Sequence, residues 1–484
     1  MKNYIIVIVL LMVGSSCSKQ SATTEETGAS DSLPNIVLIH VDDLGWTDVG
    51  AFGSDFYDTP HIDALAREGL RFTNSYAAAA ICSPTRAAMM TGKYPSRTGI
   101  TDWIRARFQG GIIPPDGQNP QGYDENGDKP LKTPKNYLYM PLSEVTIAEL
   151  LKDRGYKTAH IGKWHLGPDE YFPEHQGFDV NIGGCDLGQP PSYFDPYKPF
   201  NGNEEYIIPN LAPRKEGEYL TDREGDELVG FIQENKDKPF FVQWASYTVH
   251  TPLMGKADLV SDYESKEPGD QQNPVYAAMV KSLDENVGKV VATLDSLGIS
   301  GNTLVIFTSD NGGLMGNPSH LITNNTPLRS QKGYPYEGGI RVPTIMRWPG
   351  KIPQGKETAS PMITMDIIPT ILNYVDGEVA EDNWDGVNLL EMINHPGKTY
   401  SRDLFWHFPH YRGVDVVPYS IIRSGDFKLI HYYDGTEDEL YDLSADLSEK
   451  YNLIAERNEL ADELKQKLTV WLEKTDAKMP VEKQ

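Results

Sequence analysis

Cysteine is scarce in this chain: its 484 residues include three, Cys17, Cys82 and Cys185. Exported proteins often carry paired disulfides, but pairing is not the obvious interpretation here. If Cys17 is removed or modified and Cys82 carries chemistry of its own, Cys185 alone remains, and one thiol forms no internal disulfide. A bridge between Cys82 and Cys185 stays open as the alternative.

Positive charge is also in short supply. The chain has 44 Lys and Arg against 69 Asp and Glu, which gives a formal net charge of −25. This balance argues against a nucleic-acid partner, because neutralising phosphates requires clustered Lys and Arg. Any site for an anionic ligand must therefore be a local positive pocket inside an acidic body. Part of the acidity can be ordinary surface solvation.

Long apolar runs are absent except near the N-terminus. A lysine precedes the apolar stretch 5–13, and small residues follow it before Cys17. The stretch is too short to span a membrane comfortably, and the order basic, apolar, small is typical of an export signal. We therefore expect residues 1–17 to be a signal peptide. Cys17 resembles the lipidated cysteine of a bacterial lipoprotein, but Gly14 stands where that signal usually has an aliphatic residue, so cleavage without lipidation is the alternative.

The segment that follows the signal, residues 18–33, is rich in Ser, Thr and Glu and has no apolar periodicity. Such a composition is typical of a flexible tether. The N-terminal region as a whole predicts an exported protein, either periplasmic or an outer-membrane lipoprotein with a lipid anchor at Cys17.

The remainder of the chain contains an alternation of strands and helices. Residues 35–41 are almost continuously apolar, as in a strand that is buried on both faces of a parallel sheet. Further strands are expected at 157–161, 240–244 and 303–308, and helices at 59–68, 146–154, 222–235 and 274–297. This alternation predicts an α/β catalytic domain over residues 34–370, with a central, mostly parallel sheet flanked by helices.

The pattern changes after Asp366. Short strands separated by turns are expected at 421–423, 428–433 and 439–441, and an amphipathic helix at 460–474. The sequence therefore predicts a smaller α+β C-terminal domain over residues 371–484. Two long Pro- and Gly-rich segments, 110–134 and 184–213, interrupt the first domain and are expected to be loops that face the substrate.

Polar side chains directly follow four of the expected strands. They are Asp42 and Asp43, Lys163 and His165, His250, and Asp310 and Asn311. Ligands of open α/β sheets bind beyond the carboxyl ends of the strands, so we expect these groups to meet at one edge. Three carboxylates and an amide oxygen suit a hard divalent cation such as calcium or magnesium better than zinc, without deciding between the two. Each pair alone could instead make a turn or cap a helix.

Basic groups accompany these oxygen donors: Arg86, Lys163, His165, His250 and Lys332. A tetrahedral oxyanion such as sulfate needs several donors and positive charge, and a departing alcohol needs a proton donor, usually His. For any single Lys or Arg, the alternative is a solvated surface charge. For Lys163 and His165, the flanking glycines permit tight turns that aim both side chains the same way.

At this point the residues resemble a known family. Residues 82–86 read CSPTR and residues 91–93 read TGK. This is similar to the signature of the formylglycine-dependent sulfatases: Cys or Ser, any residue, Pro, any residue, Arg, followed by Thr-Gly-Lys or Thr-Gly-Arg. The other elements follow in the family's order: Asp42-Asp43, GKWH at 162–165, His250 before Thr251-Pro252, SDNGG at 309–313 and EGG at 337–339. The resemblance extends from about residue 35 to the C-terminal helix.

The resemblance implies an alkaline-phosphatase-like fold and a modified nucleophile. Cys82 would be oxidised to formylglycine (3-oxoalanine) by a separate maturation enzyme before or during export. One Ca²⁺ would be bound by the residues that match the family's ligands: Asp42, Asp43, Asp310, Asn311 and the modified Cys82.

The resemblance also implies the roles of the basic groups. Arg86 and Lys163 would stabilise the formylglycine hydrate and the sulfate, and Lys332 would bind the sulfate too. His250, together with Lys332, would protonate the leaving oxygen. His165 would help the sulfated hydrate to collapse and release sulfate.

These implications predict hydrolysis of sulfate esters on sulfated polysaccharides or their oligosaccharides, through a covalent sulfo-enzyme intermediate. One alternative is a phosphonate or phosphate monoester hydrolase of the same superfamily, and another is a sulfated-glycan binding protein without turnover. Aromatic loop residues could stack on sugar rings or simply pack within the loops: Trp103, Tyr193, Phe194 and Tyr197. His407, His410 and Tyr411 are candidates for a contribution of the C-terminal domain to the pocket.

Overall fold

The structure, a computed structural model, describes residues 1, 33–106, 109–114, 117–199, 206–212, 214–317, 319–377 and 384–483. Apart from Met1, the predicted signal peptide lies outside the described residues, as do Cys17 and nearly all of the tether 18–33, so these stay predictions. Within the described part, no helix combines the length and apolarity that a membrane crossing requires.

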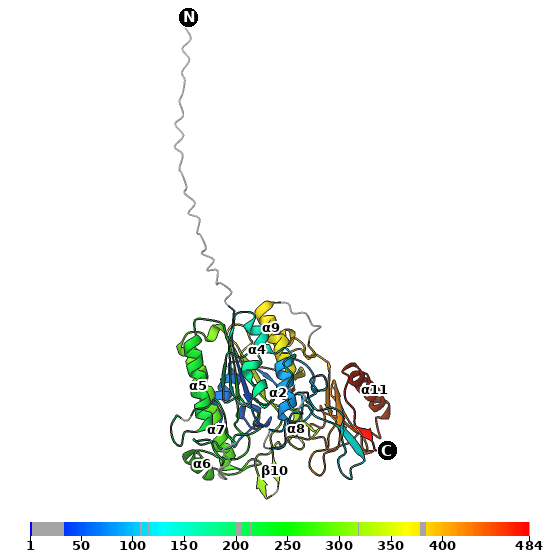
Figure 1. Ribbon diagram of the computed structural model, residues 1–484. Coiled ribbons are helices and arrows are strands. Elements are labelled where there is room, and N and C mark those ends of the chain that lie inside the picture. Colours follow the sequence, from blue (N-terminus) through cyan, green and yellow to red (C-terminus); the bar gives the residue numbers. More distant parts are fainter. Residues whose placement is uncertain are drawn as a thin grey trace. The chain divides into compact units, whose positions relative to one another are not determined.

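An eight-stranded sheet runs through the centre of residues 33–484 (Figure 1), in the order β13-β2-β12-β9-β1-β8-β6-β7. Five neighbouring strands are parallel: β9 (Thr303–Ser309), β1 (Asn35–Val41), β8 (Phe240–Ser246), β6 (Lys157–Gly162) and β7 (Val180–Ile182). Next to them, β12 (Thr344–Arg347) is antiparallel to β9 and to β2 (Leu70–Phe72), while β13 (Lys356–Thr358) is parallel to β2. The predicted mostly parallel central sheet is confirmed.

Helices cover both faces of this sheet, and the alternation of side chains along β1 assigns a core to each face. Val37, Ile39 and Val41 of β1 pack with α1 (Pro60–Arg67), α5 (Leu220–Asn235), α6 (Ala257–Glu264) and α7 (Pro274–Ser296). Ile36 and Leu38 face the opposite core, which contains α2 (Cys82–Thr91), α4 (Ile147–Lys152), α9 (Ile367–Asp376) and α10 (Leu390–Asn394). Figure 1 shows α5 and α7 on one side of the sheet and α2, α4 and α9 on the other.

The predicted helix boundaries coincide with capping residues. Asn273 accepts the backbone N–H groups of Val275 and Tyr276 at the start of α7, where Pro274 occupies the first turn. At the start of α4, Thr146 and Glu149 form a capping box, each side chain accepting the other's backbone N–H. These side chains fix where the two helices begin.

A second, antiparallel sheet lies near the C-terminus: β15 (Asp403–Phe408), β16 (Tyr419–Ser424), β17 (Phe427–Tyr432) and β18 (Glu439–Asp442). The last helix, α11 (Asn458–Lys474), packs on it. The predicted small α+β part is present, with β15 as a strand that the sequence pattern did not reveal. Residues 33–484 form one compact unit and α9 crosses the predicted boundary after residue 370, so the division into 34–370 and 371–484 stays a prediction.

Shorter elements complete the chain. The strands are β3 (Ser75–Tyr76), β4 (Tyr123–Asp124), β5 (Leu131–Pro134), β10 (Gly316–Asn317), β11 (His320–Leu321), β14 (Met362–Ile363) and β19 (Val481–Glu482). The helical turns are η1 (Gly50–Phe52), α3 (Pro95–Thr98), η3 (Asp169–Tyr171), η4 (Pro173–His175), η5 (Ser300–Asn302), α8 (Glu337–Ile340) and η6 (Thr364–Asp366). The segment 110–134, expected as a loop, thus contains the strand pair β4–β5.

Candidate active site

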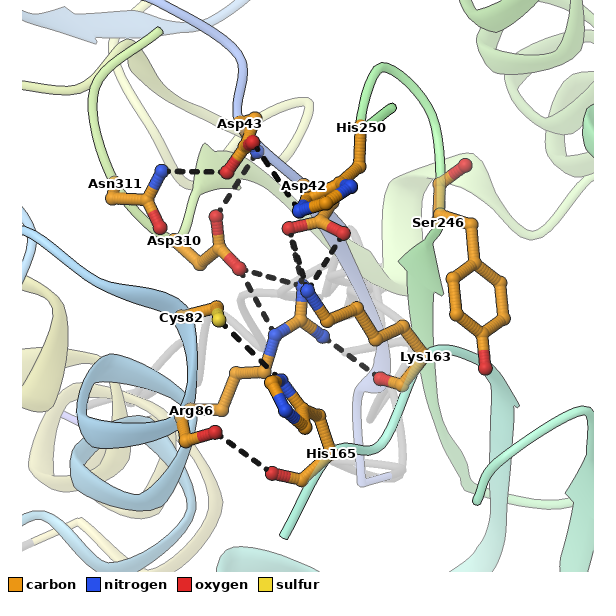
Figure 2. Close-up of polar contacts among 12 residues, drawn as sticks. Asp42, Asp43, Cys82, Arg86, Lys163, His165, Ser246, His250, Asp310 and Asn311 are labelled. Atoms are coloured by element: carbon orange, nitrogen blue, oxygen red, sulfur yellow. Dashed lines mark hydrogen bonds and ion pairs between the residues drawn. The ribbon is translucent and has the colours of Figure 1, made fainter. Parts of the chain in front are cut away.

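The carboxyl ends of β1, β6, β8 and β9 lie side by side, because these four strands are neighbours in the parallel part of the sheet. The chain that leaves each of them carries one group of predicted residues (Figure 2): Asp42 and Asp43, Lys163 and His165, His250, and Asp310 and Asn311. Contacts described below link these groups to one another and to Cys82, Arg86 and Lys332. The structure therefore brings all ten predicted site residues into one centre.

Helix α2 supplies Cys82 and Arg86. Cys82 is its first residue, and Arg86 lies four positions later, so the two side chains project from the same helix face. Pro84 fits in this first turn, where backbone N–H groups have no partner within the helix. All ten residues of α2 are buried. The five-residue motif thus presents a thiol and a guanidinium together at the N-terminal end of a buried helix.

Two buried basic groups bind the carboxylates of the site. The Arg86 guanidinium donates from Nε and Nη2 to Asp310 Oδ2, at 3.0 and 2.7 Å, and from Nη1 to the Lys163 carbonyl oxygen at 2.8 Å. Lys163 Nζ donates to both oxygens of Asp42, at 2.9 and 2.7 Å. None of these side chains is more than 2% exposed. Fixed ion pairs of this kind position the carboxylates without help from solvent.

A third basic group, Lys332, binds the remaining carboxylate. Its Nζ lies 2.5 Å from Asp43 Oδ1, which also accepts a hydrogen bond from Asn311 Nδ2 at 2.8 Å. The backbone N–H of Asp43 donates to Asp310 Oδ1 at 3.1 Å. His250 Nε2 lies 3.6 Å from the other oxygen of Asp43. Asp43 therefore connects four other site residues: Lys332, Asn311, Asp310 and His250.

Two oxygens in this cluster are buried and have no hydrogen-bond partner: Asp43 Oδ2 and Asn311 Oδ1. Buried oxygens normally have partners, so these two fit a cation that would accept them as ligands. Ligand atoms of Asp42, Asp43 and His250 lie within 4.8 Å of one another. The donor set is dominated by carboxylate and amide oxygens, which hard cations prefer over zinc.

The protonation of the carboxylates reflects their crowding. Burial raises the pKa of Asp42 well above its usual range; Lys163 opposes the shift, while Asp310 and Asp43 add to it. Burial acts in the same direction on Asp43 and Asp310, but basic neighbours outweigh it and lower the pKa of both: mainly Lys332 for Asp43 and mainly Arg86 for Asp310. Of the three carboxylates, Asp42 is the one whose ionised form is unfavourable. A bound cation would offset its repulsion by ionised Asp43 and Asp310.

His165 faces Cys82. Its Nδ1 lies 3.4 Å from Cys82 Sγ, and its Nε2 lies 2.7 Å from the carbonyl oxygen of Ile104. A carbonyl oxygen only accepts, so Nε2 carries the proton and Nδ1 of the neutral ring is free to accept one. Burial lowers the pKa of His165 well below its usual range, and Lys163 adds to this shift. His165 is therefore a neutral ring with its basic nitrogen directed at residue 82.

His250 is held by its own turn. Its Nδ1 lies 2.8 Å from the Thr251 carbonyl oxygen, which leaves Nε2 directed at Asp43. Burial lowers the pKa of His250 to about 3, and Lys332 contributes to the shift. The Tyr193 hydroxyl donates to the carbonyl oxygens of Tyr247 and His250, at 2.5 and 2.9 Å. This tyrosine, expected to stack on sugars or to pack in its loop, is buried and supports the turn that carries His250.

A pocket of about 250 Å³ opens onto this centre. Cys82, His165, His250 and Lys332 line it, and Trp103, Gln189 and Arg412 contribute to its wall. A larger cavity of about 640 Å³ lies elsewhere, between Trp46, Arg341 and Arg423. Arg341 of that cavity already binds Glu337, at 2.7 Å. The smaller pocket is the candidate active site because it alone of these two contains the predicted nucleophile.

Several expectations about the surroundings change. Cys82 and Cys185 are both free and buried, which rules out the disulfide alternative. His407 binds Ser420 and the Lys478 carbonyl, and His410 binds Thr101. Neither these histidines nor Tyr411 lines the pocket. The C-terminal contribution is Arg412, which sequence reasoning missed. No motif marks Arg412; its place depends on how the second sheet packs against the first.

The chain is similar to known proteins over most of its length. A family model described as Sulfatase matches residues 34–377, and one described as N-sulphoglucosamine sulphohydrolase, C-terminal, matches residues 330–477. A sulfatase from Formosa agariphila is 32% identical, over 97% of this chain and 94% of that protein. Human arylsulfatase A is 33% identical, over 87% of this chain and 83% of that protein.

A solved structure gives the same result. Ps i-CgsB, solved in complex with k-i-k-neocarrahexaose, is 30% identical and superposes with a TM-score of 0.74, over 91% of this chain and 93% of that chain. The expected alkaline-phosphatase-like fold is thereby confirmed, and so is the expectation of an enzyme. The chain belongs to the sulfatase family of the alkaline phosphatase superfamily and is a sulfuric ester hydrolase.

Proposed function

We propose that this enzyme hydrolyses sulfate esters of polysaccharides or their oligosaccharides by means of a formylglycine hydrate made from Cys82. The observation that carries the proposal is the convergence of three buried carboxylates and three buried basic groups on residue 82. The carboxylates are Asp42, Asp43 and Asp310, and the basic groups are Arg86, Lys163 and Lys332.

The charge of this centre suits a sulfate ester only with a cation bound. Three carboxylates and three basic groups sum to zero, which provides no net attraction for an anion in a chain of net charge −25. One Ca²⁺ held by Asp42, Asp43, Asp310, Asn311 and the modified residue 82 would make the centre +2. The bound ion supplies positive charge that offsets the charge of the transferring sulfuryl group. The two unpartnered oxygens, Asp43 Oδ2 and Asn311 Oδ1, support this assignment.

Formylglycine formation requires a separate maturation enzyme. In that step the –CH₂–SH group of Cys82 becomes –CHO by a two-electron oxidation, with an oxidant supplied by the maturation enzyme, and the sulfur leaves as sulfide. Addition of water to the aldehyde then gives a carbon with two hydroxyl groups. Arg86, on the same helix face, is placed to stabilise the hydrate, with Lys163.

The first half-reaction breaks the substrate's sulfur–oxygen bond. One hydroxyl of the hydrate attacks sulfur in line with the leaving oxygen, its proton is lost, and a sulfate ester forms on residue 82. The leaving oxygen takes a proton from His250, with Lys332 beside it. The low pKa of His250 refers to a site without substrate; an anionic ester next to the ring favours its protonated form, because opposite charges at short distance stabilise ionisation.

The second half-reaction regenerates the aldehyde. The remaining hydroxyl of residue 82 loses its proton, its oxygen forms the C=O bond, and sulfate leaves with the electrons of the C–O bond. His165 is suited to receive this proton, because Nδ1 is the basic nitrogen of the ring and lies 3.4 Å from Cys82 Sγ. Two easier steps replace one difficult displacement.

The carbohydrate substrate and the export of the protein belong to the same proposal. The complex of Ps i-CgsB with k-i-k-neocarrahexaose supports an oligosaccharide ligand, and the pocket wall combines an indole, an amide and a guanidinium, which suit sugar hydroxyls and anionic substituents. The sequence pattern of the first 17 residues supports export to the periplasm or outer membrane, in the latter case with a lipid anchor at Cys17.

Mass spectrometry of the peptide that contains Cys82 tests the modification. The expected result, in protein co-produced with a maturation enzyme, is the mass of an aldehyde side chain, in proportion to specific activity. An active preparation in which Cys82 remains a thiol would contradict the proposal. Metal analysis tests the cation: about one Ca²⁺ per chain is expected, removable by chelation with loss of activity and of thermal stability, and restored by Ca²⁺ rather than Mg²⁺.

The alternative predicted from the sequence, a phosphate or phosphonate monoester hydrolase, now concerns which ester this sulfatase prefers. Turnover of matched aryl sulfate, phosphate and phosphonate esters by matured protein measures that preference. We expect the sulfate ester to be hydrolysed with the highest kcat/KM. Faster hydrolysis of the phosphate or phosphonate ester would overturn the proposed specificity.

A further inference from the structure

The wall of the active-site pocket contains a guanidinium group that the proposed chemistry does not use. Arg412 lines the pocket together with the catalytic candidates. It lies in the loop between β15 and β16, where its backbone N–H and C=O both bond to Val416, at 3.0 and 3.2 Å. These two hydrogen bonds within the loop hold the backbone of Arg412 in a defined turn beside the pocket.

The side chain of Arg412 is held as well. It packs on Gly333, the residue after Lys332: a Cβ on Gly333 would lie 2.7 Å from Arg412 Nε and 3.1 Å from its Cδ. Gly333 also has a φ of +88°, a backbone conformation that other residues rarely adopt. The absence of a side chain at position 333 thus leaves room for the guanidinium next to the segment that carries Lys332.

The charge of Arg412 is poorly compensated within the protein. In the described part of the chain, its ion pair is with Asp102 Oδ1, at the long distance of 4.0 Å, and 32% of the Arg412 side chain is exposed. That same oxygen already accepts the backbone N–H of Trp103 at 2.8 Å. Arg105, which is exposed, also acts on Asp102: burial raises the pKa of Asp102, and both arginines oppose the shift. Among the residues that the structure describes, Asp102 thus shares its single negative charge between the Arg412 and Arg105 guanidinium groups.

An aromatic ring lies in the same wall. Trp103 lines the pocket and is partly buried, and the Arg105 guanidinium lies 5.6 Å from its ring centroid. Indole faces suit the apolar faces of sugar rings, and the Arg105 guanidinium over the Trp103 ring is attracted to its π-system. The wall therefore offers a surface for a sugar ring and, beside it, a fork of N–H donors for an anion.

We propose that Arg412 and Trp103 form a subsite for a second anionic substituent of the substrate, a sulfate ester or a carboxylate, on the sugar that carries the scissile sulfate or on its neighbour. This inference rests on the proposed function and narrows its substrate class to sugars with at least two anionic groups. Arginine suits either anion, because its planar fork binds sulfate and carboxylate oxygens in pairs.

Competition experiments with matured enzyme test the subsite. Turnover of 4-nitrophenyl sulfate is the reporter, and the competing probes are galactose 6-sulfate, galactose 2,6- and 4,6-disulfate, and glucuronic acid 2-sulfate. We expect the best doubly charged probe to inhibit at a concentration about 10-fold or more below that of the monosulfate. If a disulfate inhibits more tightly, the subsite binds a second sulfate. If glucuronic acid 2-sulfate inhibits more tightly, the subsite binds a carboxylate.

The variant Arg412→Gln should reduce this preference to within about 3-fold, and Arg412→Lys should retain part of it, because a single ammonium keeps the charge but loses the fork. Arg154→Gln is the matched control: its side chain is similarly exposed, at 31%, and pairs with Asp376. Thermal unfolding of each variant excludes misfolding. The inference is overturned if wild type shows no preference, or if Arg412→Gln weakens all probes equally. If matured wild type releases sulfate from no sulfate ester, the proposed function itself fails.

Discussion

The formylglycine hydrate proposed for residue 82 can be distinguished by experiment from an ordinary hydroxyl. In Cys82→Ser, produced in a host that oxidises only cysteine, one hydroxyl can attack sulfur but no second hydroxyl can expel sulfate. We expect one sulfate ester to accumulate per chain, visible as a mass increase of the peptide that contains residue 82, with no turnover beyond that event. Cys82→Ala should acquire no sulfate and should unfold at the same temperature as wild type. Continued turnover by either variant would rule out the mechanism.

The free energy of unfolding should depend on pH through the ionisation of Glu224. It is fully buried and accepts hydrogen bonds from Trp244 Nε1 and Ser246 Oγ, at 3.0 and 2.8 Å. Burial raises the pKa of Glu224 to about 7 from an ordinary value of 4.5. The folded protein thus binds this proton more tightly than the unfolded chain does, so the associated stability is present below pH 4.5 and is lost as the pH rises through 7.

The comparison of wild type with Glu224→Gln isolates this effect. From pH 4.5 to 7, the free energy of unfolding of wild type should fall by about 1–3 kcal/mol relative to the variant. Calorimetry of both proteins at several pH values measures it. A constant difference between the two over this range would mean that Glu224 ionises normally in the folded protein.

At the scale of elements, a buried charge network attaches the C-terminal sheet to the segment that carries Lys332. Lys428 of β17 binds Glu337 of α8 at 3.1 Å and Glu449 at 2.7 Å, and Glu449 also accepts the Glu337 backbone N–H at 2.7 Å. The lysine and both carboxylates are fully buried. The second sheet is therefore joined to the active site by ion pairs as well as by apolar packing.

Removal of the Lys428 side chain should lower the stability of the protein. Lys428→Met leaves two buried carboxylates without their common cation, and we expect a loss of about 3–5 kcal/mol of stability. The double variant Lys428→Met/Glu449→Gln should recover part of it, because the charge of Glu449 is gone while Glu337 keeps the Arg341 guanidinium at 2.7 Å. Thermal or denaturant unfolding measures both. Additive losses in the double variant would show that the three groups do not act as a unit.

Some strands of the structure could be predicted from the sequence and others could not. The strands at 35–41, 240–244 and 303–308 were predictable because each contains a run of apolar residues, as buried parallel strands do. The strand at 157–161 has no such run and was predicted from its place in the alternation of helices and strands. The polar residues that follow all four strands share one edge of the sheet. The strands β2, β12 and β13 were not, since three or four residues give no measurable period. The roles of Tyr193 and Arg412 depend on loops and sheets that meet only in three dimensions.

At the scale of the whole molecule, the negative net charge of the protein repels the proposed anionic substrate. A chain of net charge −25 repels a sulfated polymer at long range, while the centre, positive once the proposed Ca²⁺ is bound, would act only inside the pocket. We expect kcat/KM for a sulfated polysaccharide to rise several-fold as the ionic strength increases from about 0.01 to 0.15 M, since the screening length falls from about 30 to 8 Å.

A small aryl sulfate is the control for this effect, because it carries one charge. Its kcat/KM should change much less over the same range of ionic strength. A fall in polysaccharide turnover with added salt would instead indicate that positive surface regions, rather than the acidic body, dominate the encounter.

The burial of α2 has a consequence for the order of events in the life of the chain. Cys82 is 4% exposed and every residue of its helix is enclosed, while the pocket above it holds about 250 Å³, far too little for the catalytic machinery of another protein. If Cys82 is oxidised as proposed, the maturation enzyme should therefore reach the thiol only while this stretch is still extended. We expect a chain that folds with its thiol intact to stay inactive when it meets the maturation enzyme later, and to gain activity only if it is first unfolded.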